Sequence, residues 1–200
     1  MPFFPCAHTA HPLWRQAVKQ VVAQLWAQVS MQKLDAQPCL GVVYVSAAYA
    51  PHASQILAML AAALPAVQHW VGCAGYSVLA GDVDYGHSGA LAVMLSYVDG
   101  QHYEVFSSVA PKAAARFVPR TALVHGDVSA PESVRKVPGW LASVSGADSM
   151  GGLCGLQNSY AQWAWGANAV THMPSSIGGE GVQVGGLSGV AFAAPVDCLV

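Results

Sequence analysis

The sequence predicts an α/β fold, in which helices pack on a mixed β-sheet or on a pair of sheets. Short apolar segments of strand length alternate with longer segments whose apolar residues recur at helical spacing. The segment 40–46 (LGVVYVS) is apolar on both faces, which is typical of a central strand covered on each side. The order strand, helix, strand and glycine-rich stretch occurs twice, which predicts two similar βαββ-type lobes behind an N-terminal helix.

The N-terminal region is predicted to hold an extended segment and one long helix. Residues 1–10 are expected to be extended, and Pro12 suits the first position of a helix. Apolar side chains such as Val18, Val21 and Leu25 then recur on one face, so that face should be buried. The helix is expected to end near residues 31–33.

A strand, a helix and a second strand are predicted next. Residues 40–46 form the first strand, Pro51 opens a helix over residues 52–64, and residues 67–73 form the second strand. The sequence GCAG at residues 72–75 is expected to make a glycine-rich corner at the end of that strand.

A hairpin is predicted beyond this corner. A short strand is expected at residues 76–80, a polar loop at 81–88 and a strong strand at 89–97. The dipeptide Asp99-Gly100 is a turn signal. Polar and apolar residues alternate over 102–107, which predicts a half-exposed hairpin partner for the preceding strand.

The second half of the chain repeats this order with weaker signals. A helix and a loop both fit residues 110–119, and Ser129 is a good cap for a helix that runs to about residue 144. The sequence GGLCG at residues 151–155 predicts a second glycine corner. Strands are expected at residues 121–125, 148–153, 156–165 and 182–193.

These elements fit one domain over residues 1–200, with lobes at about 38–109 and 119–195. The order of the elements is the evidence for the repeat, because few residues are identical between the two lobes. Each lobe contributes one glycine corner, so a cleft is expected near the two corners.

The two corners together are the candidate binding site. Glycine allows a ligand to approach the main chain closely, and free amide groups there could hold a carboxylate. For any single glycine a tight turn is the simpler explanation, whereas the pair of corners favours a ligand. The candidate ligand-binding residues are Gly72, Cys73, Ala74, Gly75, Gly151, Gly152, Cys154 and Asn158.

Other clusters carry less weight. The spacing Cys6-x-His8-x-x-His11 resembles half of a metal site, but it supplies too few ligands, and no metal is expected. Cys73 and Cys154 occupy similar places in the two corners, yet buried inert cysteine is the simpler interpretation than a nucleophile. Tyr160, Trp163 and Trp165 fit either a ligand wall or sheet packing.

Composition excludes several classes of function. The protein is 54% hydrophobic, 9% charged and carries a net charge of −2, so no basic footprint for nucleic acid is present. The apolar runs fall short of the roughly 20 residues of a membrane span, and the N-terminus does not read as a signal peptide. Five cysteines without a CxxC pair fit a reduced, cytoplasmic location. A surface with so few charges is expected to meet a partner or a ligand.

Several of these segments together resemble the N-terminal half of the FIST sensory domain. The resemblance rests on five segments: LGVVYVS, the helix ending in Leu64-Pro65, the VGCAG stretch, GALAVML at 89–95 and GGLSGVAF at 185–192. The opening AHTAHPLWRQAVKQVVAQL is similar to the family's first helix, although His11 or Pro12 stands where an Asp is common. The resemblance covers nearly the whole chain.

The resemblance implies an intracellular signal-transduction module that binds a small ligand, with amino acids as the suggested class, and no catalysis. Some family members bind haem and report nitric oxide, so a haem sensor using one of the eight histidines is the alternative. A cysteine-dependent enzyme is a second alternative. The family usually carries a C-terminal module, so that module or a signalling protein is the expected partner.

Overall fold

The computed structural model describes residues 4–32, 38–107, 117–127, 148–154, 162–165, 182–183 and 186–194. Over these ranges the fold is mixed α/β, as the sequence predicts. The helical and extended segments of the first half are α1 (Trp14–Gln32), a 3-10 turn (Ala47–His52), α2 (Ala53–Ala63), β1 (Cys6–Ala10), β2 (Leu40–Ser46), β3 (His69–Gly75), β4 (Leu79–Ala80), β5 (Val83–Asp84) and β6 (Ala90–Ser96). The strands that follow are β7 (Tyr103–Ser107), β8 (Thr121–Asp127), β9 (Asp148–Cys154), β10 (Gln162–Trp165), β11 (Val182–Gln183) and β12 (Leu187–Phe192).

Two large sheets divide the strands between them. Sheet A has the order β1-β6-β2-β3-β10-β11, and sheet C has the order β7-β12-β8-β9. Among the described strand pairs, β2 and β3 run parallel in sheet A, β8 and β9 run parallel in sheet C, and the others are antiparallel. The small hairpin of β4 and β5 forms a third sheet.

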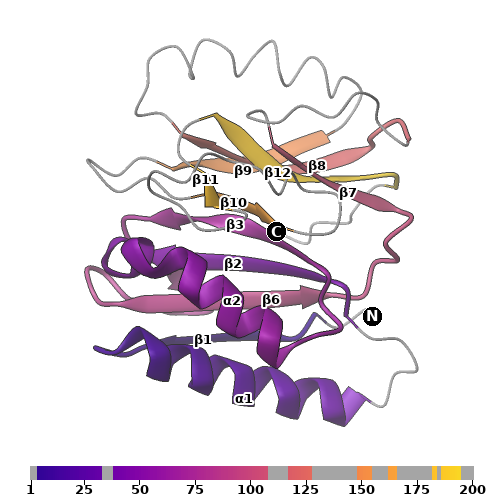
Figure 1. Cartoon of the computed structure of the whole chain (residues 1–200). Helices are drawn as coiled ribbons and strands as arrows, with labels where there is room; N and C mark the ends of the chain where they lie inside the picture. Colours follow the sequence, from indigo (N-terminus) through magenta and orange to yellow (C-terminus); the bar gives the residue numbers. More distant parts are fainter. Residues whose placement is uncertain are drawn as a thin grey trace.

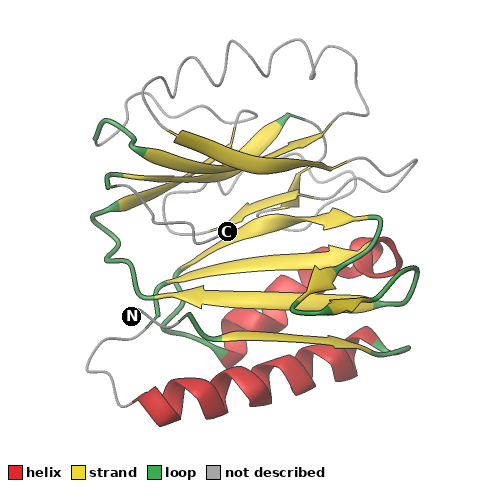
Figure 2. Cartoon of the chain, turned by 180° about the vertical axis from the view of Figure 1, so that it is seen from behind, coloured by secondary structure: helices red, strands yellow, loops and turns green. Residues whose placement is uncertain are grey.

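Sheet A is covered on both faces, which explains why its central strands are mostly apolar on both faces. Helices α1 and α2 lie together on one face, in front of the sheet in Figure 1 and behind it in Figure 2. Val18 and Leu25 from α1, and Leu60 from α2, pack there against Val43 and Val93 of the sheet. Leu40–Ser46 is therefore the central, doubly covered strand that the sequence predicts.

Sheet C packs on the other face of sheet A. Val42 and Val71 of sheet A share a buried cluster with Tyr103, Val105 and Val190 of sheet C. Alternation along each strand therefore sends Trp70 and Ala74 of β3 toward the helices, and Val71 toward sheet C. The side chains of the candidate site lie in this layer between the sheets.

The four strands β1-β6-β2-β3 and the four strands β7-β12-β8-β9 follow the same order and the same directions. In each set the strand that comes first in sequence (β1 or β7) lies at one edge, and the strand that comes last (β6 or β12) lies next to it. The second and third strands in sequence follow (β2 and β3, or β8 and β9). The division into lobes at about 38–109 and 119–195 stays a prediction. The sheets group the strands on other bounds, because β1 belongs to sheet A and β7 (Tyr103–Ser107) belongs to sheet C.

Three local predictions are wrong. β7 does not pair with β6 as a hairpin; it pairs with β12, because Tyr103 and Val105 are buried between the sheets. The turn at Asp99 still forms, with a 2.8 Å bond from the amide of His102 to its carbonyl oxygen. The expected last strand at 182–193 is two strands in different sheets, β11 and β12. The glycine corner at 72–75 lies within β3, as described next.

Candidate functional site

Two rows of side chains face each other between the sheets. The register places Tyr44, Cys73 and Gln162 side by side across β2, β3 and β10. On sheet C it places Ser188 beside His125 across β12 and β8. We call these five residues the polar inter-sheet layer.

Hydrogen bonds connect the two rows directly. The hydroxyl of Tyr44 and Nε2 of His125 lie 3.0 Å apart, and their rings meet edge to face at 5.5 Å. The hydroxyl of Ser188 donates to Oε1 of Gln162 at 2.8 Å, and Nε2 of Gln162 donates to the carbonyl oxygen of Gly186 at 3.0 Å. Gln162 and Ser188 are buried, so these bonds supply partners for polar groups that are cut off from water.

His125 is the most unusual member of the layer. It is only 1% exposed, and burial lowers the pKa of its imidazole from 6.5 to about 4. The ring is therefore neutral at physiological pH. Its Nδ1 has no hydrogen-bond partner among the described residues, although it is buried. A buried ring nitrogen without a partner is costly, and such a group calls for an explanation.

The layer lies toward the carboxyl ends of two parallel strand pairs. Tyr44 is near the end of β2 and His125 is near the end of β8. At the opposite end, the first residue of β3, His69, is 2.7 Å from the hydroxyl of Tyr103, which begins β7. β7 and β8 are both antiparallel to β12 and therefore run in the same direction. Because β3 and β7 begin at the same end of the molecule, the pairs β2/β3 and β8/β9 point the same way. Ligands in α/β proteins commonly bind outside such carboxyl ends.

The predicted site residues are brought near one another, but as strands rather than corners. Gly72, Cys73, Ala74 and Gly75 all belong to β3. The stretch from Gly151 to Cys154 belongs to β9. β3 and β9 approach within 8 Å between Cα atoms across the two sheets. Asn158 lies outside the described residues, as does Gly155.

The close approach of neighbouring strands explains why glycine occupies positions 72 and 151. A Cβ atom on Gly72 would overlap the carbonyl oxygen of Val43, its partner in β2, and Gly72 has a φ of +147° that other residues rarely adopt. A Cβ atom on Gly151 would overlap the carbonyl oxygen of Val124, its partner in β8. The glycines are thus needed by the sheets, and the ligand role of the residues around them remains a prediction.

Four residues of the layer were not predicted from the sequence: Tyr44, His125, Gln162 and Ser188. The available signal was the polar side chain inside an otherwise apolar strand, as in LGVVYVS and TALVHGD. Such a residue is buried with a partner or has a function, but its partner cannot be read from one strand.

The metal-like spacing near the N-terminus does not form a cluster. Nδ1 of His8 lies 2.7 Å from the hydroxyl of Tyr85. Nδ1 of His11 accepts the amide of Leu13 at 2.9 Å. Among the described residues, no three side chains of His, Cys, Asp or Glu gather as metal ligands would. Burial raises the pKa of the thiol of Cys6, which disfavours the thiolate that a metal would bind.

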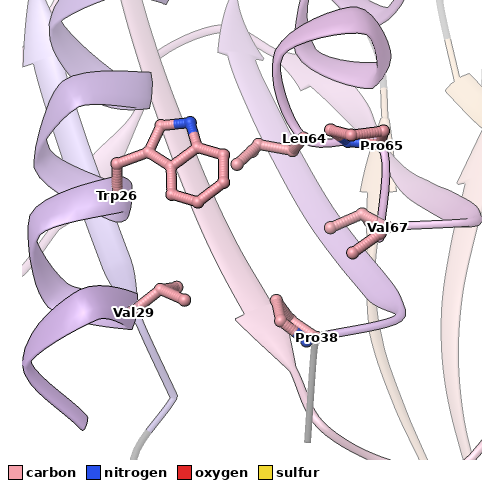
Figure 3. A pocket seen from close by; sticks show the side chains of 7 residues that line it. Trp26, Val29, Pro38, Leu64, Pro65 and Val67 are labelled. Atoms are coloured by element: carbon pink, nitrogen blue, oxygen red, sulfur yellow. The ribbon is translucent and has the colours of Figure 1, made fainter. Parts of the chain in front are cut away.

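An open pocket of about 220 Å³ lies between the end of α1 and the connection from α2 to β3 (Figure 3). In this view the indole of Trp26 faces Leu64 across the pocket. The pocket is lined by Trp26, Val29, Pro38, Leu64, Pro65, Ala66 and Val67. None of these residues can ligate haem iron, so the pocket does not fit that group. The buried imidazole of His125 packs against Tyr44 and does not line this pocket.

Within the described ranges, no helix is both long enough and apolar enough to cross a membrane.

Comparison with known families gives one result that covers most of the chain. The model of the FIST N domain matches residues 39–197, a span that runs from just before β2 to beyond β12 and includes the whole polar inter-sheet layer. No curated protein matches the chain. The family is one of sensory domains. Apart from β1, the matched span contains every described strand of both sheets, and the chain therefore belongs to the FIST N domain family of sensory domains.

Proposed function

We propose that this protein is a cytoplasmic sensory module that binds a small ligand in the polar inter-sheet layer, without catalysis. The observation that carries the proposal is the buried Nδ1 of His125, which has no partner among the described residues. A ligand with one hydrogen-bonding group near this nitrogen would satisfy it. Amino acids are the class to test first, because the family resemblance suggests them and because their amino and carboxylate groups can donate or accept the missing hydrogen bond.

The layer also suggests how binding is passed on. Tyr44 belongs to sheet A and His125 belongs to sheet C, so a ligand that bonds Nδ1 of His125 acts on a ring that already connects the two sheets. It would favour whichever packing of the sheets suits it best, and so shift the population toward that state. The receiver in this proposal is a C-terminal FIST module or another signalling protein.

Thermal unfolding of the intact chain tests the proposal with a panel of amino acids, related metabolites and haem. A ligand that binds only the folded state at about a hundredfold excess over its dissociation constant adds about 2.7 kcal/mol of stability. The variant His125→Phe removes the ring nitrogens, fills a similar volume and should abolish the shift. The control variant Gln28→Ala changes a residue of α1 that bonds β1, and the ligand-induced shift should persist in it.

Two outcomes would count against this function. If no compound on the panel raises the midpoint, this chain does not bind such ligands unaided. If the shift persists in His125→Phe, the ligand binds elsewhere. A shift with haem alone, accompanied by a Soret band, would favour the haem sensor instead.

A further inference from the structure

The matching strand orders of the two sheets allow their edges to be compared. In sheet A, β3 pairs with β2 on one side and with antiparallel β10 on the other. In sheet C, β9 occupies the place that β3 occupies in sheet A, and it pairs with β8. Among the described residues, no strand pairs with the second side of β9.

The two glycines show the difference at a single position. Gly72 faces Val43 in the register as Gly151 faces Val124, and each is too close to that partner for a side chain. On its other side Gly72 is paired with Trp163 of β10, whose indole lies against it, and it is buried. Gly151 is exposed to solvent, and no described strand takes the corresponding place beside it.

The edge strand β1 of sheet A is capped by a side chain. The amide of Cys6 in β1 donates to Oε1 of Gln28 at 3.0 Å, and its carbonyl accepts from Nε2 of Gln28 at 2.8 Å. The side chain of Gln28 in α1 thus takes the place of a neighbouring strand. In β9 (DSMGGLC) one charged residue, Asp148, is present, and there is no proline or lysine to discourage pairing.

We propose that the outer edge of β9 accepts an antiparallel strand from a partner protein, with an aromatic residue placed opposite Gly151. Main-chain hydrogen bonds to the edge supply the affinity, as in other cases of β-strand addition. The aromatic side chain supplies the selectivity, because an indole fills the matching place beside Gly72. The edge of β9 contains none of the five residues of the polar inter-sheet layer, although Gly152 of β9 pairs with His125 in the register. The proposal can therefore be tested without a ligand.

Amide hydrogen exchange of the intact chain, read residue by residue by NMR, tests this proposal. The probe is a peptide that carries the β10 sequence QWAW between terminal lysines. In the free protein, the amides of β9 that point away from β8 should exchange much faster than those of the central strand β12. With the peptide at about a hundredfold excess over its dissociation constant, their exchange should slow roughly a hundredfold.

Two matched peptides distinguish strand addition at the edge from non-specific hydrophobic binding. N-methylation of alternate backbone amides removes the donors but keeps the tryptophans, and this peptide should give no protection of β9. Replacement of both tryptophans by alanine keeps the donors and should weaken protection at equal concentration. β3 serves as the internal control, because its edge is already filled by β10.

Three results would overturn the proposal. β9 amides that are as protected as those of β12 in the free protein would show that the chain covers this edge itself. Equal protection by the parent and the N-methylated peptide would show that no strand is added. Protection that grows with protein concentration in the absence of peptide would identify a second copy of the chain, and not a partner protein, as the occupant.

Discussion

Acidification should weaken the fold through one residue, His125. Its imidazole has a pKa of about 4 in the folded protein because it is buried, against 6.5 when exposed. Between these two pH values the unfolded chain takes up a proton at this ring before the folded chain does, so the free energy of unfolding falls as the pH falls. The full difference corresponds to about 3 kcal/mol, of which about 2 kcal/mol should be lost by pH 5.

Urea unfolding of wild type and His125→Gln, at steps between about pH 7 and pH 4.5, measures this effect. Glutamine does not titrate, so the difference in stability between the two proteins should shrink by about 2 kcal/mol from pH 7 to pH 5. Tyr44→Phe keeps the imidazole buried and should retain the wild-type slope. Parallel profiles for wild type and His125→Gln would refute the reasoning, because they would mean that the ring is not held neutral by burial.

Three further substitutions and one control follow from the packing and the hydrogen bonds. Gly72→Ala should cost more than about 3 kcal/mol in urea unfolding, because its Cβ would overlap Val43, whereas Gly100→Ala, which meets nothing within 4 Å, should stay within about 0.5 kcal/mol. Ser188→Ala removes a buried donor to Gln162 and should cost about 1–3 kcal/mol in thermal unfolding. Gln28→Ala should cost about 1 kcal/mol and speed exchange of the Cys6 amide, and an unchanged rate would contradict its role at the edge of β1.

Local patterns predicted the elements whose neighbours lie close in sequence. The helical spacing of Val18, Val21 and Leu25 predicted the buried face of α1, and all three are buried. The doubly apolar LGVVYVS predicted a covered central strand, and β2 is one. Each of these signals depends only on which face of one element is buried.

Predictions failed where a distant contact outweighed the local signal. The Asp99-Gly100 turn favoured a hairpin, but burial of Tyr103 against sheet A directs β7 into the other sheet. Glycine at position 72 signals either a turn or a close approach of strands, and only the pairing with β2 decides between them. Tyr44 and His125 are 81 residues apart, so their contact depends on how the two sheets stack.

The path of the chain between the sheets sets the order in which the protein can be completed on the ribosome. After β9 in sheet C, the chain crosses to sheet A for β10 and β11, and then returns to sheet C for β12. β6 ends at Ser96 and β10 begins at Gln162, so synthesis at about 5–20 residues per second leaves the edge of β3 unpaired for several seconds. During that interval the nascent chain presents the unpaired main-chain edge of β3 at Gly72, which makes β3 the expected binding point for a chaperone and the expected start of misassembly in truncated chains.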